Sequence, residues 1–193
     1  EWIEALKAAD AIEENGITVA YSYIGPELTY PIYFDGTIGQ AKRHLENTAK
    51  VMREKFPKLQ SYVSVNKALV TQASAAIPIV PLYFAILYKV MKQAGNHEGC
   101  IEQISRLFKE KLLEEQVPVD EEGRIRMDDW ELSEEVQKKV VEAWKQVTTE
   151  NVTEISDIEG YWEDFYQMFG FHLSGVDYGK DVDVEVKIPS LEA

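Results

Sequence analysis

Two short apolar runs with an amphipathic stretch between them constrain the fold of this chain more than any other feature. Residues 17–22 read Ile-Thr-Val-Ala-Tyr-Ser, and the run at 59–65 contains Ser-Tyr-Val-Ser-Val. Continuous apolar runs of this kind are typical of parallel strands that are buried on both faces. Between them, residues 37–54 place apolar side chains on one helical stripe, and Pro57 ends the pattern. The order strand, helix, strand predicts a βαβ unit, and Tyr23 falls just beyond the first strand, where ligands of parallel sheets bind.

The rest of the chain has a mostly helical pattern. An amphipathic helix over residues 2–14 is expected to end at Asn15-Gly16, a good C-terminal signal. A nearly all-apolar helical segment at 73–93 is expected to break near Pro78 and Pro81. The other expected elements are a long helix from the loop at 96–99 to about Glu115, a short strand at 124–127, a helix after the N-cap Ser133, and a last helix from a capping box of Ser156 and Glu159 to about Gly170. These elements predict an α/β fold with extra helices.

Tyr33 and Lys42 are the pair with the clearest chemical meaning. A phenol beside an ammonium can donate a proton to a carbonyl substrate, because the positive charge is expected to lower the pKa of the phenol. Each helical residue advances by about 100°, so a separation of nine residues would place the two side chains on opposite faces of one helix. We therefore expect a break between Gly36 and Gly39, with Thr37 as the N-cap of the helix that carries Lys42. One unbroken helix through both residues would contradict this interpretation.

Several separated blocks of sequence, all in the same order, carry a resemblance to a known family. The blocks are Ala-Tyr-Ser-Tyr-Ile-Gly at 20–25, Tyr33, Gly-Thr-Ile-Gly at 36–39, Lys42, and the runs at 64–74, 96–103 and 128–132. They closely resemble trans-2-enoyl-CoA reductases and the related V-type bacterial enoyl-ACP reductases, over a range from about Trp2 to about Val186. The resemblance implies an enlarged relative of the short-chain dehydrogenases, with a Rossmann-type α/β fold and extra helices.

The same resemblance implies how the chain is organised. In the family's enzymes, the N-terminal half carries the Gly-rich strand-turn-helix that binds the dinucleotide pyrophosphate. No Gly-rich signature of this kind is visible here, and the chain begins with Glu1 rather than Met. We therefore expect residues 1–193 to be the C-terminal catalytic and substrate-binding part of a single Rossmann-type domain. The N-terminal half of the same enzyme, absent from this chain, is the expected partner.

By resemblance, three side chains form the catalytic site. Tyr33 is the expected acid or oxyanion donor, and Lys42 is expected to reach the nicotinamide ribose and to keep the surroundings of the tyrosine positive. Gln40 stands where some relatives carry a second lysine, so Lys42 is the lysine to consider. Tyr23 is expected to contact the substrate. Either tyrosine could donate the hydrogen bond to the thioester carbonyl, and the sequence leaves this division open.

A second segment is expected to bind the cofactor. Leu69, Val70 and Thr71 follow the second strand, and they resemble the segment whose backbone and hydroxyl hold the nicotinamide. The apolar helix after them is expected to form a wall of the acyl pocket. Between residues 97 and 100, one His, one Glu and one Cys are too few and too closely spaced for a metal site, so no metal is expected.

The implied activity is the NADH-dependent reduction of trans-2-enoyl-CoA to saturated acyl-CoA. Hydride is delivered to C3, and the negative charge that builds on the thioester oxygen must be stabilised and protonated. The alternative carrier is acyl carrier protein, an acidic protein that would need basic residues at the pocket mouth. The choice between NADH and NADPH is expected to lie in the other half. A hypothesis of another class is an acidic helical interaction module without catalysis, which the absence of a Gly-rich turn upstream would favour.

Charge and cysteine content exclude several classes of partner. Asp and Glu number 34 against 20 Lys and Arg, a net charge of −14, which argues against nucleic acid and anionic membranes as partners. The single cysteine, Cys100, allows no internal disulfide and fits a reducing cytoplasm. The longest apolar stretch, at 73–88, contains prolines and is too short to span a bilayer comfortably.

Overall fold

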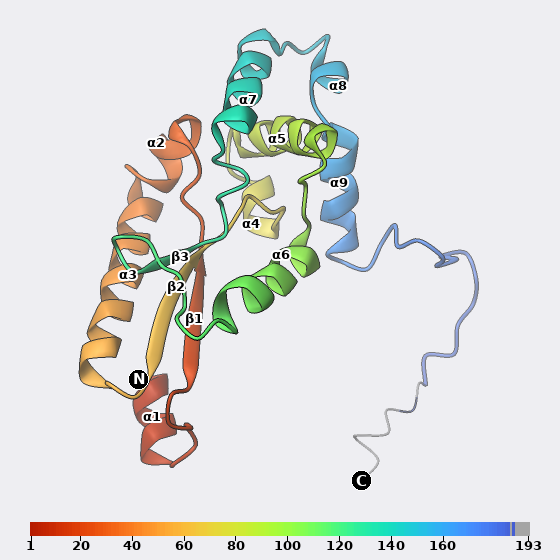
Figure 1. Ribbon diagram of the computed structural model, residues 1–193. Coiled ribbons are helices and arrows are strands. Elements are labelled where there is room, and N and C mark those ends of the chain that lie inside the picture. Colours follow the sequence, from red (N-terminus) through yellow and green to blue (C-terminus); the bar gives the residue numbers. More distant parts are fainter. Residues whose placement is uncertain (186, 188–193) are drawn as a thin grey trace.

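The computed structural model describes residues 1–185 and 187, so Val186, where the family resemblance was expected to end, lies outside the described residues. At its centre is a parallel sheet of three strands in the order β1-β2-β3 (Figure 1). The strands are β1 (Ile17–Ser22), β2 (Gln60–Val65) and β3 (Arg124–Arg126). Each strand predicted from the sequence is confirmed, and its ends lie within a residue of the expected range.

The predicted βαβ unit is also confirmed. Helix α3 (Thr37–Lys55) connects β1 to β2, and Ser22 and Val65 are paired at the carboxyl ends of these strands. Beyond the strands, the N–H of Asn66 donates to the Ser22 oxygen at 2.8 Å, and the N–H of Met127 donates to the Val65 oxygen at 2.9 Å. The three chain segments that leave the sheet therefore start side by side, at the edge where ligands of parallel sheets bind.

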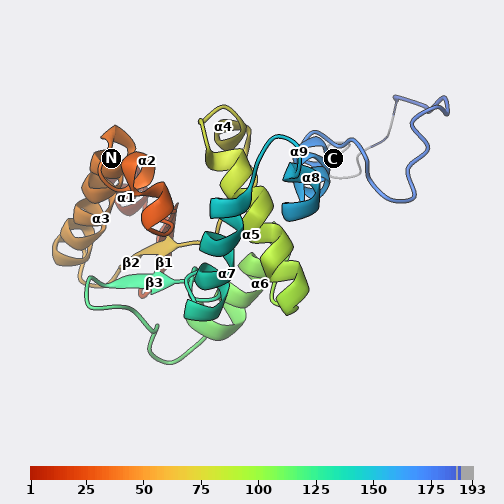
Figure 2. The ribbon, with the colours of Figure 1, turned by 90° about the horizontal axis from the view of Figure 1, so that it is seen from above.

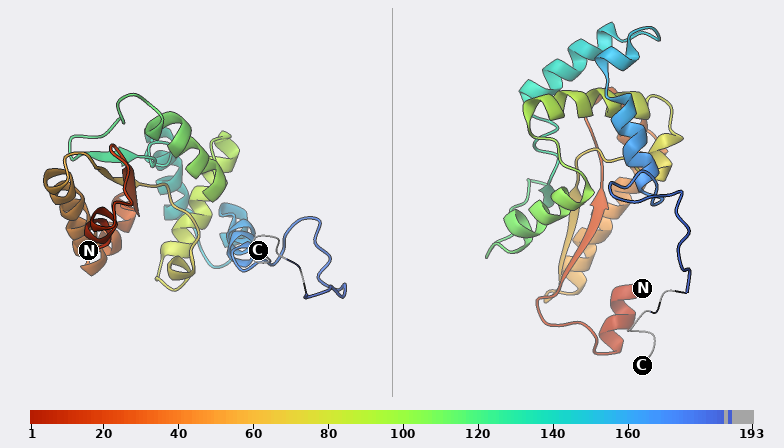
Figure 3. Two further views of the ribbon diagram at one scale, coloured as in Figure 1. Left: turned by 90° about the horizontal axis from the view of Figure 1, so that it is seen from below. Right: turned by 90° about the vertical axis from the view of Figure 1, so that its right-hand side faces the viewer.

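Strand β1 forms one edge of the described sheet, and one of its faces is bare. Ile17 and Tyr21 point to the same face, and they are 43% and 55% exposed. Figure 3, right, shows this strand in front, with α3 behind it. The expectation that β1 is buried on both faces is therefore wrong for the described residues. The apolar run shows that the strand is suited to burial, but no described residue covers Ile17 and Tyr21 completely.

The N-terminal helix is shorter than expected. α1 spans Trp2–Ala8 instead of residues 2–14. Asp10 and Asn15 both adopt the left-handed conformation, with φ of 53° and 64°, which a right-handed helix cannot include. The chain therefore turns twice before β1, and Asn15 belongs to the second turn and not to the end of the helix.

The remaining elements are helical. They are η1 (Glu27–Thr29), α2 (Tyr30–Tyr33), α4 (Gln72–Ala75), α5 (Val80–Ala94), α6 (Cys100–Leu107), the π-helical η2 (Phe108–Leu112), α7 (Glu134–Gln146), α8 (Val152–Ile155) and α9 (Ile158–Gln167). Two predicted N-caps were wrong by one residue. Gly36 precedes α3 in place of Thr37. Asp157 caps α9 by accepting from the Gly160 N–H at 3.2 Å, because the Ser156 hydroxyl donates to the preceding turn.

The apolar segment breaks near its prolines, as the sequence predicted. Ile79, between α4 and α5, has φ of 64°, which is unusual for a β-branched residue, and Pro81 lies in the first turn of α5. α5 is buried along most of its length and packs between α7 and α9 (Figure 2). Among the described residues, no helix is long and apolar enough to cross a membrane.

Candidate active site

The break that was predicted between Tyr33 and Lys42 is confirmed. Tyr33 is the last residue of α2, and Lys42 lies in the second turn of α3. A Cβ atom at Gly39 would lie 2.0 Å from the carbonyl oxygen of Phe34, so only glycine allows the first turn of α3 to begin directly against the end of α2. This close approach brings the two side chains to one place although they belong to different helices.

Tyr23, Tyr33 and Lys42 meet beyond the carboxyl end of β1. The rings of Tyr23 and Tyr33 pack edge to face, with centroids 4.9 Å apart. The Lys42 ammonium lies 5.0 Å from the ring centroid of Tyr33 and 5.7 Å from that of Tyr23, within the range of cation–π contact. It also donates a hydrogen bond to the backbone oxygen of Tyr23. The structure therefore brings together the three side chains that the sequence singled out.

Burial dominates the acidity of these groups. Burial, with a smaller effect of Tyr161, raises the pKa of Tyr33 to about 12. Burial lowers the pKa of Lys42 to about 8, against the opposing effect of Glu46. The expectation that the ammonium lowers the pKa of the phenol is therefore wrong here, because Lys42 faces the rings and a backbone oxygen while the Tyr33 hydroxyl is desolvated. Tyr33 keeps its proton at neutral pH, and most Lys42 side chains are charged.

A cavity of about 350 Å³ opens beside Tyr33 and Lys42. Arg43 and Arg124 add positive charge to its lining, which is completed by Ile24, Phe34, Gly39, Glu46 and Glu122. Arg124 is held by Asp120 at 2.9 Å. Within the described part of the chain, the Tyr33 hydroxyl has no hydrogen-bond partner. The wall of the cavity therefore includes a tyrosine whose hydroxyl is unbonded among the described residues and a lysine.

Leu69, Val70 and Thr71 lie in the segment that leaves β2. Val70 belongs to the same packed cluster as Tyr33, and its N–H donates to the Tyr88 hydroxyl at 3.1 Å. The Thr71 hydroxyl caps α4 by accepting from an N–H of that helix at 3.1 Å. These contacts fix the segment next to the tyrosines. The N–H of Val70 is already used, so a cofactor would have to meet other backbone groups of the segment.

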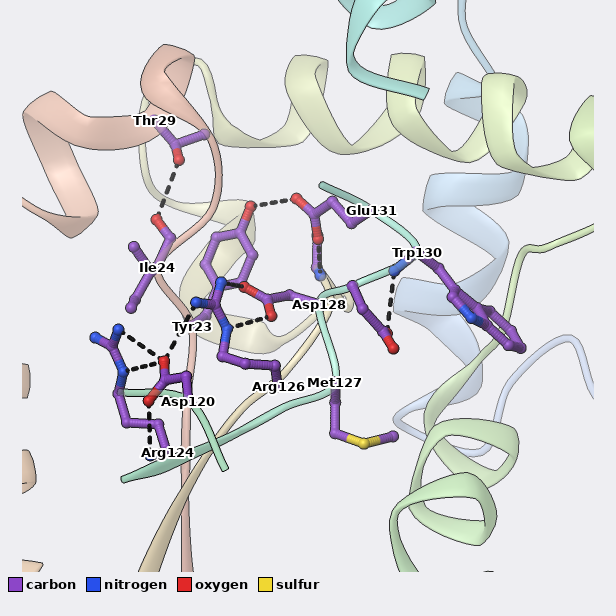
Figure 4. A network of polar contacts seen from close by, with 12 residues as sticks. Tyr23, Ile24, Thr29, Asp120, Arg124, Arg126, Met127, Asp128, Trp130 and Glu131 are labelled. Atoms are coloured by element: carbon purple, nitrogen blue, oxygen red, sulfur yellow. Dashed lines mark hydrogen bonds and ion pairs between the residues drawn. The ribbon is translucent and has the colours of Figure 1, made fainter. Parts of the chain in front are cut away.

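The sequence reasoning missed a buried carboxylate that binds the second tyrosine. The Tyr23 hydroxyl donates to Glu131 Oε1 at 2.9 Å, and Figure 4 shows the two side chains pointing toward each other. Burial raises the pKa of Glu131, although its hydrogen-bond donors oppose this change. A signal existed in the sequence, because the run at 128–132 is one of the blocks that carry the family resemblance. The sequence gives that block no role.

A second missed group ties the segment after β2 to the loop at 96–99. Lys67 is 1% exposed, and its ammonium donates to the backbone oxygens of Ala68 and Glu98 at 2.9 and 3.1 Å. Arg106 binds the Glu98 carboxylate through two nitrogens at 2.9 and 2.7 Å. Burial lowers the pKa of Lys67 to about 8. Both runs belong to resembling blocks, but only the folded structure places them together.

Two family models match the chain. One, described as the trans-2-enoyl-CoA reductase catalytic region, matches residues 1–113. The other, described as the enoyl reductase FAD binding domain, matches residues 119–182. Together they account for most of the chain.

Individual relatives agree with the first of these models. Trans-2-enoyl-CoA reductase (NADH) of Clostridium perfringens is 60% identical over 185 residues, which are 95% of this chain and 47% of the relative. Enoyl-acyl-carrier-protein reductase (NADH) of Flavobacterium johnsoniae is 55% identical over 194 residues, which are 99% of this chain and 49% of the relative. The crystal structure of Treponema denticola trans-2-enoyl-CoA reductase in complex with NAD matches with a TM-score of 0.90 and 53% identity, over 94% of this chain and 46% of that chain.

The chain therefore spans about half the length of the relatives it matches. Its α/β fold corresponds to the C-terminal half of their enlarged Rossmann-type fold. The chain belongs to the trans-2-enoyl-CoA reductase family.

Proposed function

We propose that the protein of which this chain forms a part reduces trans-2-enoyl-CoA to saturated acyl-CoA with NADH. The observation that carries the proposal is the meeting of Tyr23, Tyr33 and Lys42 beside a cavity at the carboxyl end of β1. The relative from Clostridium perfringens is named for this substrate and for NADH. Because the chain covers about half of that relative, the activity is proposed for the whole protein.

Tyr33 is the proposed proton donor. Addition of hydride to C3 of the enoyl thioester places negative charge on the thioester oxygen, which a neutral hydroxyl can stabilise and protonate. The resulting enol then gains a proton at C2 and loses the proton on oxygen, which gives the saturated thioester. Burial raises the pKa of Tyr33 to about 12, so the phenol carries its proton throughout the neutral range. Its hydroxyl makes no hydrogen bond to another described residue, so its proton is not committed within this chain, and we propose that a substrate bound beside Tyr33 receives it.

Lys42 and the segment at 69–71 are the groups of this chain that would hold the nicotinamide end of the cofactor. When bound, NADH supplies the hydride for the reduction. The residues fit this group, because the Lys42 ammonium lies next to Tyr33 at the cavity and can donate hydrogen bonds to ribose hydroxyl oxygens. A pKa of about 8 leaves most of the Lys42 side chains charged at neutral pH. The ammonium can then donate to the hydroxyl oxygens of the ribose and stabilise the negative charge on the thioester oxygen.

Residues 119–182 do not fit a flavin dinucleotide, in spite of the description of the family model that matches them. Proteins bind a diphosphate with Gly-rich turns, helix N-termini or basic side chains. Arg124 and Arg126 are already paired with Asp120 and Asp128, at 2.9 and 2.6 Å. The first turn of α7 carries Glu134 and a second acidic residue, which repel phosphate. We therefore assign no step to a flavin.

Acyl carrier protein is the second candidate carrier of the substrate. The Flavobacterium johnsoniae relative is named for it and is 55% identical. The carrier is acidic, and this chain has a net charge of −14, so its basic contacts would have to come mainly from the other half of the protein. A non-catalytic interaction module is less well supported, because such a module has no use for an unbonded phenol and a partly buried ammonium in one cavity.

The N-terminal half of the same enzyme is the proposed partner of the bare face of β1. Ile17 and Tyr21 expose apolar surface there, and β1 has a free edge in the described sheet. An exposed edge strand with apolar side chains is suited to pairing with a further strand. This supports the division in which residues 1–193 form the catalytic and substrate-binding part of one domain.

We propose that the protein works in the cytoplasm. Its single cysteine, Cys100, is exposed and free, which suits a reducing compartment.

The proposed function is tested by an assay of the full-length protein with crotonyl-CoA, in which NADH and NADPH are compared. Tyr33→Phe and Lys42→Ala are each expected to lower kcat/KM by about 10²- to 10⁴-fold, the usual contribution of a positioned acid and its electrostatic support. Undiminished turnover in both variants refutes the site. An enoyl thioester of acyl carrier protein, assayed in parallel, decides between the two carriers.

Two matched variants serve as controls. Tyr30→Phe changes a tyrosine of the same short helix, whose ring stacks on Phe34 at 4.8 Å and does not line the cavity. Lys55→Ala changes an exposed lysine at the end of the same helix α3, where it pairs with Glu4. Both variants are expected to keep wild-type kcat/KM.

A further inference from the structure

The carboxylate of Glu131 is fully buried and receives three hydrogen bonds. Its exposure is 0%. Oε1 accepts from the Tyr23 hydroxyl at 2.9 Å and from the Tyr83 hydroxyl at 2.7 Å, and Oε2 accepts from the Ala68 N–H at 2.6 Å. A buried carboxylate is tolerated only when its oxygens are paired in this way.

The directions of these hydrogen bonds are fixed by their partners. When Glu131 is ionised it can only accept, and in this state the Tyr23 proton points at Glu131. The side-chain amide nitrogen of Gln137 lies 3.3 Å from the Tyr83 hydroxyl and can only donate, so the Tyr83 proton also points at Glu131. The same nitrogen donates to the backbone oxygen of Glu131 at 2.8 Å. The orientation of the carboxylate and of both phenols is therefore determined.

The three donors come from the places where the proposed site is built. Tyr23 follows β1, Ala68 lies in the segment between β2 and α4, and Tyr83 belongs to α5. Glu131 itself comes from the segment that leaves β3, which Figure 4 shows passing next to Tyr23. One carboxylate thus joins the segments that leave all three strands, and Ala68 precedes the proposed nicotinamide segment at 69–71.

We propose that Glu131 is a positioning residue for the reduction. It holds the Tyr23 ring against Tyr33 at a centroid distance of 4.9 Å, and it engages the Tyr23 proton. Tyr23 then supports the ring of Tyr33 from the side with its own proton already engaged, and Tyr33 gives the proton to the substrate. This resolves the division of labour between the two tyrosines that the sequence leaves open. The inference rests on the proposed function of the full-length enzyme.

Glu131→Gln in the full-length enzyme separates this role from simple support of the fold. The Ala68 N–H can only donate, so the amide oxygen of the new side chain is expected to turn toward it. The amide nitrogen then faces Tyr23 and Tyr83, and it reverses the hydrogen bond at Tyr23 without a change of shape. We expect kcat with crotonyl-CoA to fall about 10- to 100-fold, as for a small misplacement of a catalytic group. The KM for NADH should stay near wild type, because the bond to Ala68 is kept.

A cycle with Tyr23→Phe supplies the readout that a structural role would not change. If Glu131 acts through the Tyr23 hydroxyl, Glu131→Gln should cause no further loss of kcat in the Tyr23→Phe background. Glu98→Gln is the matched control, because Glu98 is also a buried glutamate but its hydrogen bonds go to Arg106 and Gln103. Its kcat loss should be equal in both backgrounds.

The outcomes distinguish this inference from the proposed function. Equal losses from Glu131→Gln in the two backgrounds, or no loss at all, overturn the positioning role while the reductase activity stands. A wild-type enzyme that reduces neither thioester overturns both. If Glu131→Gln does not fold, as judged by its thermal transition, the cycle of Tyr23→Phe with Tyr83→Phe replaces it. These two hydroxyls share Oε1, so non-additive effects on kcat support the inference and additive effects overturn it.

Discussion

Burial sets the charge state of each group around Tyr33 and Lys42. The phenol of Tyr33 is desolvated, so it keeps its proton and can act as a donor but not as a base at neutral pH. The ammonium of Lys42 is only partly desolvated, and its pKa of about 8 lies at the edge of the physiological range. Lys42 therefore loses its charge at a lower pH than an exposed lysine does.

The alkaline limb of the reaction is expected to follow Lys42. Below a pH of about 8 the ammonium is charged, and above it the charge is lost, so kcat/KM for NADH in the full-length enzyme should fall as pH rises through this value. Tyr33, with a pKa of about 12, does not titrate in this range. Lys42→Arg keeps its charge, so the alkaline decline should disappear even if overall activity is lower. An identical alkaline midpoint in both proteins would show that another group controls the profile.

The identities of Tyr23, Tyr33 and Lys42 could be predicted from the sequence, but their acidities could not. The spacing of Tyr33 and Lys42 required a helix break, and family resemblance supplied the roles. The pKa of Tyr33 depends on packing by residues far along the chain, such as Tyr161. Glu131 is separated from Tyr23 by 108 residues, so no local pattern indicates their hydrogen bond.

At the scale of elements, the segments between them hold the site in place. Arg106 on α6 binds Glu98 in the preceding loop, and it also contacts the segment after β3 through Asp129 at 3.0 Å and the Met127 oxygen at 2.7 Å. Its guanidinium lies 4.1 Å from the ring centroid of Trp130. One side chain therefore fixes the position from which Glu131 reaches the tyrosines.

Removal of Arg106 should destabilise the protein strongly. Arg106→Leu leaves the Glu98 carboxylate, which is 3% exposed, without its charged partner, and we expect a loss of about 3–5 kcal/mol in the free energy of unfolding. The double variant Arg106→Leu with Glu98→Leu should recover a large part of this loss, because no buried charge remains. Urea denaturation of the full-length protein measures both effects.

The surface pair of Lys139 and Glu135 provides the comparison for this experiment. It lies on α7 at 2.7 Å, but both side chains are more than half exposed. Lys139→Ala should therefore leave the denaturation midpoint unchanged. If Arg106→Leu also unfolds at the wild-type urea midpoint, then water reaches Glu98 and the buried network contributes little to stability.

The positions of the elements were more predictable than their ends. The positions of β1 and β2 could be predicted because a short run of apolar residues is itself the sequence signal for a strand. The predicted end of α1 was wrong because Asp10 and Asn15 adopt left-handed conformations, although the apolar pattern of the sequence continues past Asp10. The cap of α9 was wrong because Ser156 and Asp157 could each accept the same kind of hydrogen bond. Only the path of the chain decides between such neighbours.

At the scale of the whole molecule, the exposed face of β1 is where we propose that the N-terminal half of the protein packs. Buried parallel strands are covered on both faces, but β1 is covered here on one. The chain spans about half the length of the relatives it matches. The proposal is that a further part of the protein covers this face. The exposed fraction of Tyr21 in this chain should therefore overstate its exposure in the full-length protein.

A pair of substitutions matched in exposure tests this placement. Tyr21, in β1, is 55% exposed and Val51, on α3, is 56% exposed, so this chain buries the two side chains to the same extent. If the N-terminal half covers β1, Tyr21→Lys should cost the full-length protein about 2 kcal/mol, whereas Val51→Lys should stay within about 0.5 kcal/mol, as for an ordinary surface change. Urea denaturation of the full-length variants measures both. Strand propensity alone accounts for about 1 kcal/mol at Tyr21, so a loss no larger than this would place the other half elsewhere.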